Sequence, residues 1–219
     1  MTILMGGAAS AAGGGGGDSF YSPGTYHYDS SRGLASFSTP DGGGADITVE
    51  RGSFVFAPRG STTLTLVSGT VVGLNTYDPS GTWSGGCFMI PDSDFTMDPS
   101  MRSAHLQTTL PATSNCGDGT LMTIDHRVLH RPDDHSRGGS SIDLTWTWQG
   151  VVSTNQQNGQ SACGSYHTEQ RDTNALAFTT VTGSISGLGD HLVAGPYASL
   201  YRTGWDIMVT GSYGPLCAY

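Results

Sequence analysis

Apolar and polar residues alternate most regularly in the middle of the chain, over residues 120–152. In the segment 141–152 every second position from Ile142 to Trp148 is apolar, and in 120–131 every second position from Met122 to His130 is apolar or histidine. Such alternation, rich in β-branched and aromatic residues, is typical of strands with one buried face. Residues 132–139 between them have the Pro, Asp and Gly content of a turn. This stretch predicts a long antiparallel hairpin.

The two apolar sets also restrict the register of this hairpin, because directly opposite residues share a face. One register of the required parity places His126 opposite Trp146 and Ile124 opposite Trp148. A strand face with two tryptophans is expected to be core between sheets. The alternative is a stacking platform for a sugar or another flat ligand, formed by Trp146, Trp148 and His126.

The rest of the chain is expected to form short strands separated by turns or loops. The breaks fall at residues 30–33, 40–44, 58–60, 78–81, 153–161 and 172–174, and at Gly204. No window combines helical periodicity with helix caps. The predicted fold is therefore all-β: an antiparallel sandwich or barrel-like domain of about a dozen strands, with short turns and negligible helix.

The first 18 residues are rich in glycine and alanine, and we interpret them as a leader, either a shortened signal peptide or a flexible tail. Residues 19–219 are expected to form a single all-β domain, since a chain of this length buries enough surface to fold unaided. Two β domains divided near residues 115–119 are the alternative.

Composition supports this fold class and excludes some partners. Glycine is abundant at 33 residues, charged residues make up only 12%, lysine is absent, and Glu50 and Glu169 are the only glutamates. Helices usually need more Ala, Leu, Glu and Lys. The formal charge of −9 argues against nucleic acid as a partner. No segment approaches the roughly 18 apolar residues of a membrane helix, so no membrane insertion of the folded domain is expected.

The cysteines indicate an oxidising compartment. Cys87, Cys116, Cys163 and Cys217 are an even number without a C-x-x-C pair, which favours two disulfides in a secreted or cell-surface protein. Three connectivities are open. Nearest-neighbour pairing, Cys87–Cys116 and Cys163–Cys217, would give each half of the chain its own bond.

Two groups of residues are candidate metal ligands. His126 and His130 lie about 13 Å apart on a regular strand and cannot share one ion, but His130, His135 and Asp133 can converge through the turn. Asp92, Asp94 and Asp98 follow the spacing of a calcium loop, although Met97 and Ser103 occupy the usual glycine and glutamate positions. A structural calcium ion is the one cofactor that the sequence suggests.

Motifs for nucleophilic catalysis or phosphate binding are absent from the sequence. We therefore interpret the chain as an exported, disulfide-bonded β-protein that is a surface or structural component or binds a ligand. A glycan or another surface protein is the expected partner. The alternatives are a secreted hydrolase of an extracellular polymer and a self-assembling filament or virion subunit, since unprotected β edges pair with one another.

Overall fold

The computed structural model describes residues 23–62, 65–116, 138–187, 193–195 and 197–212. The predicted all-β fold is confirmed: the described part contains strands and a single 3-10 turn, η1 (Asp92–Asp94). The strands are β1 (Gly24–Ser38), β2 (Gly44–Pro58), β3 (Thr65–Tyr77), β4 (Trp83–Ile90), β5 (Phe95–Met97), β6 (Ser103–Thr109), β7 (Ser141–Cys163), β8 (Tyr166–Ile185), β9 (Val193–Ala194) and β10 (Ala198–Thr210).

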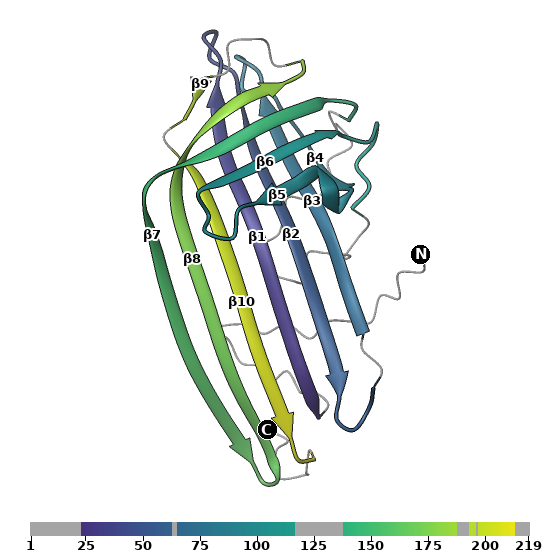
Figure 1. The fold of residues 1–219 in the computed structure, drawn as a ribbon. Coiled ribbons are helices and arrows are strands. Elements are labelled where there is room, and N and C mark those ends of the chain that lie inside the picture. The colour runs from purple at the N-terminus through teal and green to yellow at the C-terminus, as the bar shows by residue number, and fades with distance from the viewer. Residues whose placement is uncertain (1–22, 63–64, 117–137, 188–192, 196, 213–219) are drawn as a thin grey trace.

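These strands form one 10-stranded antiparallel sheet in the order β4-β3-β2-β1-β10-β8-β7-β6-β5, with β9 beside β1. The sheet is curled into a half-barrel: β5, β6 and the first part of β7 cross over β1–β3 (Figure 1). A bulge in β7 permits this bend, since Trp148 pairs with Thr179 and the next paired residue is Val152, opposite Ala177. Gly150 within the bulge has φ +114°. We call the crossed part of the sheet the upper half and the remainder the lower half.

The main core fills the curl of the upper half. Trp146 is 0% exposed there, and its indole Nε1 donates a hydrogen bond to the Leu34 carbonyl at 2.9 Å. Gly33 makes room for this ring, because a Cβ at that position would lie 3.3 Å from the indole. Phe95 meets the ring edge-on, with ring centroids 6.4 Å apart. We call the face of the sheet that bears this core the inner face.

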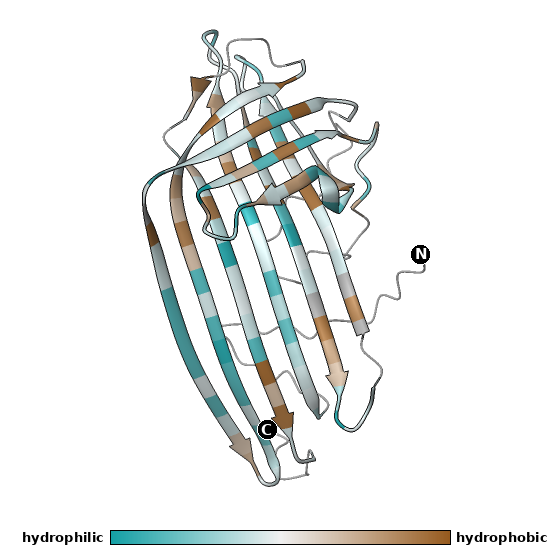
Figure 2. Ribbon diagram, viewed as in Figure 1, coloured by the Kyte–Doolittle hydropathy of each residue, from teal (hydrophilic) through white to brown (hydrophobic). Residues whose placement is uncertain are grey.

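The long strands change their apolar face about half-way along. In the upper half of β1, Ala35 and Phe37 are buried on the inner face. In the lower half the buried residues, Tyr26 and Tyr28, have the opposite parity and belong to the outer face. A second cluster forms on that face from Tyr26, Tyr166, Ile207 and Val209, with Phe56 and Trp205 packed against it. The inner face of the lower half consequently carries polar residues such as His27 and Asp29, with Leu66 and Met208 exposed nearer its lower end. Polar residues predominate along the middle of the long strands (Figure 2).

The predicted partner of residues 141–152 is wrong. Residues Ile142–Thr147 of β7 pair with β6 on one side and with β8 on the other, so no edge is left for residues 120–131. Ala104 and Val181, not His126, lie opposite Trp146. The alternation determines which residues of a strand lie on its buried face, but it does not determine which strand pairs with it. β6 and β8 both place apolar residues on the same face as Trp146. Residues 117–137 lie outside the described residues.

Four predicted breaks are also wrong. Residues 30–33, 153–161 and 172–174 and Gly204 lie inside β1, β7, β8 and β10, respectively. The apolar pattern is interrupted at these positions because the strands change their buried face or are polar on both faces. The turns predicted after β1, β2 and β3 are confirmed. The leader, residues 1–18, lies outside the described residues.

The Cys87–Cys116 disulfide is confirmed, with the two Cα atoms 5.5 Å apart. Cys163 is also disulfide-bonded, and Cys217 lies outside the described residues. The bond holds residues 114–116 along the outer edge of β4. There the Cys87 N–H donates to the Ser114 hydroxyl at 3.1 Å, and the Met89 N–H donates to the Asn115 side-chain oxygen at 2.7 Å. A search of the described residues for helices able to cross a membrane finds none.

Candidate ligand-binding groove

A polar groove crosses the inner face of the lower half, directly below the overhanging η1 and β5. One hollow of ≈ 520 Å³ lies over β1, β10, β8 and β7, and a second of ≈ 240 Å³ lies between β1–β3 and η1–β5. Asp29 lines both hollows. The two hollows therefore adjoin at Asp29 and follow one another across the strands, and we call them together the groove.

The strand register arranges the side chains of the groove in rows. Asp29, Gly204, Thr173 and Gln156 lie opposite one another on four neighbouring strands. His27, Asp206, Arg171 and Asn158 form the next row in the same way. Since directly opposite residues share a face, each row presents carboxylate, amide, hydroxyl or basic groups side by side.

Hydrogen bonds between neighbouring strands orient several of these groups. The Arg202 guanidinium donates from Nε to Asp29 Oδ1 and from Nη2 to Asp29 Oδ2, both at 3.4 Å. His27 Nδ1 lies 2.7 Å from Asp206 Oδ1. Arg171 Nη2 donates to Gln156 Oε1 at 3.3 Å. These planar groups are held by their partners and keep further donor and acceptor positions for a ligand.

Gly204 forms the floor of the groove at its centre. A Cβ there would lie 3.0 Å from the Thr173 hydroxyl and 3.8 Å from Asp29 Oδ1. A larger side chain would therefore project into the space between these two polar groups. Gly204 leaves Asp29 and Thr173 accessible to a ligand.

Positive and negative groups are mixed along the groove. Asp29, Asp92 and Asp206 line it together with Arg51, Arg202 and His27. The Arg202–Asp29 pair is only partly buried, with the side chains 43% and 37% exposed, so water reaches both groups. A mixture of this kind favours a neutral ligand with many hydrogen-bonding groups over a polyanion or a polycation.

The aromatic residues singled out from the sequence do not line this groove. Trp146 lies in the core, which is the first of the two interpretations weighed for its face. Trp148 is half-buried at the lower end of the core, and the Arg102 guanidinium carbon lies 6.0 Å from its ring centroid. Its Nε1 has no hydrogen-bond partner among the described residues. His126 lies outside the described part of the chain.

The candidate calcium ligands are near the groove but are not gathered around one point. Asp92 accepts a hydrogen bond from the Thr70 hydroxyl at 2.7 Å, and Asp94 accepts one from Thr108 at 2.8 Å. Asp98 has a pKa below its usual range because the hydroxyl and the N–H of Ser100 donate to it. No cluster of three potential metal ligands occurs in the ranges that the structure describes. His130, His135 and Asp133 lie outside those ranges, and both metal sites stay predictions.

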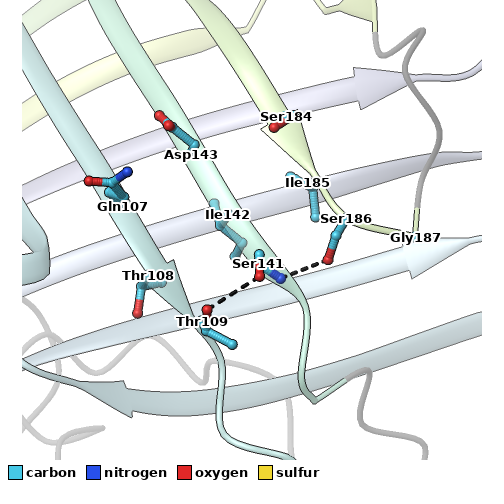
Figure 3. Close-up of a pocket in the computed structure, with 10 residues that line it drawn as sticks. All are labelled: Gln107, Thr108, Thr109, Ser141, Ile142, Asp143, Ser184, Ile185, Ser186 and Gly187. Carbon is cyan, nitrogen blue, oxygen red and sulfur yellow. Dashed lines mark hydrogen bonds between the residues drawn. The ribbon is translucent and has the colours of Figure 1, made fainter.

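A further hollow, of ≈ 810 Å³, lies at the ends of β6, β7 and β8 (Figure 3). Its polar lining consists mainly of hydroxyl groups, and three of its residues bind one another. Thr109 and Ser141 have their hydroxyl oxygens 3.3 Å apart, and the Ser141 N–H donates to the Ser186 hydroxyl at 2.7 Å. Asp143, its only charged group, lies 3.0 Å from His105 Nε2. Compared with this hollow, the groove offers more charged and polar groups held in place by hydrogen bonds, and it is the better candidate for a ligand-binding site.

Sequence reasoning missed the groove because its residues come from segments interpreted as loops. Asp29, Gln156, Thr173 and Gly204 lie in or beside the four wrongly predicted breaks. The available signal was a reversal of parity: Tyr26 and Tyr28 precede the first break at even positions, and Ala35 and Phe37 follow it at odd positions. Two apolar sets of opposite parity on one uninterrupted strand imply that each half of the strand has its own polar face.

No protein-family model matches the chain, and no curated protein matches it in sequence. Among solved structures, a candidate AttH protein from Nitrosomonas europaea aligns at 10% identity with a TM-score of 0.28, covering 89% of this chain and 54% of that one. The enduracididine biosynthesis enzyme MppR aligns at 10% identity and TM-score 0.27, covering 88% of this chain and 89% of that one. An acetoacetate decarboxylase-like enzyme from Sphingomonas wittichii RW1 aligns at 11% identity with a TM-score of 0.25, covering 87% of this chain and 93% of that one. The chain spans about half the length of the AttH protein. These values are too low to inform fold or function.

Proposed function

We propose that the protein is an exported binding protein whose groove takes up a neutral, hydroxyl-rich ligand, an oligosaccharide. The observation that carries this proposal is the row Asp29–Gly204–Thr173–Gln156, with Asp29 held by Arg202 at 3.4 Å. Carboxylates, amides and guanidinium groups can each bind adjacent hydroxyls in pairs, and a groove that extends across several strands suits a chain molecule. Export is supported by the disulfide, which persists in oxidising compartments.

The ligand is expected to lie across the strands. The groove reaches from β3 to β7, six neighbouring strands, and strands are spaced about 4.8 Å apart. Such a length exceeds one sugar ring. Phe95 and Trp205 border the two hollows, but Phe95 is buried and Trp205 packs against the outer-face cluster, so binding would depend on hydrogen bonds and on contacts with Met97 and Ala175 rather than on ring stacking.

A glycan array followed by calorimetry tests the proposal. Arg202→Ala removes the donors beside Asp29, and Gly204→Leu fills the floor of the groove. Each should weaken oligosaccharide binding by about tenfold or more, since hydrogen bonds to charged groups are worth roughly 1.5–3 kcal/mol. Thr182→Leu, on the exposed outer surface of β8, is the matched control and should bind normally. Absence of any glycan ligand, or unchanged affinity in both groove variants, would contradict the proposal.

A hydrolase of an extracellular polymer is the second candidate, because Asp29 and Asp92 line the same hollow. Pairs of carboxylates flanking a sugar are the usual machinery of glycoside hydrolysis. Incubation of an array hit with the protein, followed by chromatography, separates the two functions. Cleavage that disappears in Asp29→Asn would establish the hydrolase, whereas an intact oligosaccharide supports the binding protein.

A further inference from the structure

The lower half of β7 has one paired edge and one open edge. Residues Val152–Cys163 pair along their whole length with Ala177–Tyr166 of β8. Within the described part of the chain, no strand pairs with the opposite edge of this segment. By contrast, residues Ile142–Thr147 of the same strand are paired on both sides. The N–H and C=O groups of the open edge are therefore available to another strand.

This edge lacks the features that normally prevent strands from pairing. Residues 152–163 contain no charged residue and no proline, although the protein carries a formal charge of −9. The bulge of β7 precedes this segment and leaves it regular. The outer edge of β4, in comparison, is covered by Ser114 and Asn115. Natural proteins protect exposed edges with charges, prolines, bulges or covering loops, so an edge of this length that none of the described residues covers indicates a partner.

We propose that the partner is a second copy of this chain, and that the two β7 edges pair antiparallel about a two-fold axis at Gln157. A two-fold axis perpendicular to the sheet keeps the inner faces of both copies on the same side, which requires residues of equal parity to be opposite. With the axis at Gln157, this residue opposes its own copy, Gln156 opposes Asn158, and Ser153 opposes Ser161. These pairs bring amide to amide and hydroxyl to hydroxyl, Thr154 opposes Gln160 and Asn155 opposes Gly159, and no like charges come into contact.

Self-pairing of β7 also fits the open edges better than a filament does. Among the described residues the lower end of β3 is another open edge, because β4 pairs with β3 only from Thr70 to Tyr77, and β5 is the last strand at the other end of the sheet. A contact between β3 and β7 would be heterologous and would extend into a fibre. Such a contact would pair the short open edge of β3 with the longer open edge of β7. Pairing of β7 with its own copy matches equal lengths and closes after two subunits.

The dimer would place two grooves next to each other. Thr154, Asn155 and Gln156 line the groove and also belong to the paired edge. Because the inner faces are continuous across the axis, the two grooves would lie on one surface. A long polymer could then engage both subunits, and the affinity would rise through the effective concentration of the second site.

Light scattering coupled to size exclusion tests the assembly on the full chain. The wild-type protein should elute as a dimer, and Gln157→Lys should raise its dissociation constant at least tenfold because two ammonium groups would meet at the axis. Thr182→Lys adds the same charge on the outer surface of β8 and should leave the dimer intact. A monomeric wild-type protein at tens of micromolar, or a Gln157→Lys variant that dimerises normally, would overturn the proposal.

Cysteine cross-linking tests the geometry independently of any loss of folding. Opposite residues in an antiparallel pair have Cα atoms about 4.5–5.5 Å apart, within the range of a disulfide. Gln157→Cys should therefore form a covalent dimer on oxidation. Asn155→Cys is the matched control, since its copy would lie about 13 Å away along the strand, and it should stay uncross-linked. Cross-linking of Ser68→Cys on β3 with Asn155→Cys, or fibres in place of dimers, would replace the two-fold dimer by the heterologous arrangement.

Discussion

Arg32 and Glu50 form a buried ion pair at the level where the strands change their apolar face. The Arg32 guanidinium donates from Nε at 3.0 Å and from Nη2 at 2.6 Å to Glu50 Oε2, and the Tyr28 hydroxyl donates to Oε1 at 3.3 Å. The side chains are 8% and 18% exposed. A charge buried to this degree costs several kcal/mol of desolvation unless its counter-charge is in place.

Glu50→Gln keeps the shape of the side chain but removes the counter-charge, and we expect it to lower the free energy of unfolding by about 3 kcal/mol. Glu169→Gln provides the matched control, because the other glutamate of the chain is exposed on β8. That variant should stay within about 0.5 kcal/mol of the wild type. Urea unfolding monitored by tryptophan fluorescence measures both. Equal midpoints for the two variants would show that the pair has no structural role.

At the scale of an element, the turn between β3 and β4 is organised by one carboxylate. Asp78 Oδ1 accepts hydrogen bonds from the Ser80 hydroxyl at 2.6 Å and from the N–H groups of Ser80 and Thr82, both at 2.9 Å. Gly81 closes the turn with φ +83°. The donation by the Ser80 hydroxyl, followed by that of the Thr82 N–H, holds the pKa of Asp78 below its usual value of 3.8.

This lowered pKa gives the turn a defined pH dependence. Between the folded and the unfolded pKa the unfolded chain binds more protons, so the contribution of Asp78 is complete above pH 3.8 and is lost as the pH falls through the folded pKa. Asp78→Asn should therefore be less stable than the wild type at pH 7, and the difference should shrink below pH 4. Carboxyl-carbon NMR titration checks the cause. A titration midpoint for Asp78 at the usual value for aspartate would contradict this explanation.

The strands also show how far a single sequence can be interpreted. The alternation at Ile142, Leu144 and Trp146 correctly predicts a strand with one buried face, and these residues are in the core. The choice of partner failed because that alternation is shared by β6 and β8. The polar segment 153–161 was interpreted as a loop, since a strand that is exposed on both faces has no apolar period to detect. Most residues of the groove were hidden for the same reason.

At the scale of the whole molecule, the curled sheet ends at β4 on one side and at β5 on the other. Cys116 follows β6 in the chain and is bonded to Cys87 in β4, so the connection after β6 returns to the opposite end of the sheet. The Asn115 N–H donates to the Cys87 carbonyl at 3.0 Å, which reinforces this contact. The composition predicted two disulfides, but only the fold explains why this one stabilises the curl.

The double variant Cys87→Ala/Cys116→Ala removes this link, and its effect follows from the 29 residues that separate the cysteines. On the chain-entropy account, a loop of this length contributes roughly 3.5 kcal/mol by restricting the unfolded chain. We expect a loss of that order in urea, together with faster hydrogen exchange at the backbone amides of positions 87 and 89 as the edge of β4 opens. Ser114→Ala removes the two hydrogen bonds that this hydroxyl makes with the Cys87 backbone and should cost only about 2 kcal/mol. If the double variant were no less stable than Ser114→Ala, the bond would not be what holds the curl closed, and the strongest physical reason for export to an oxidising compartment would be lost with it.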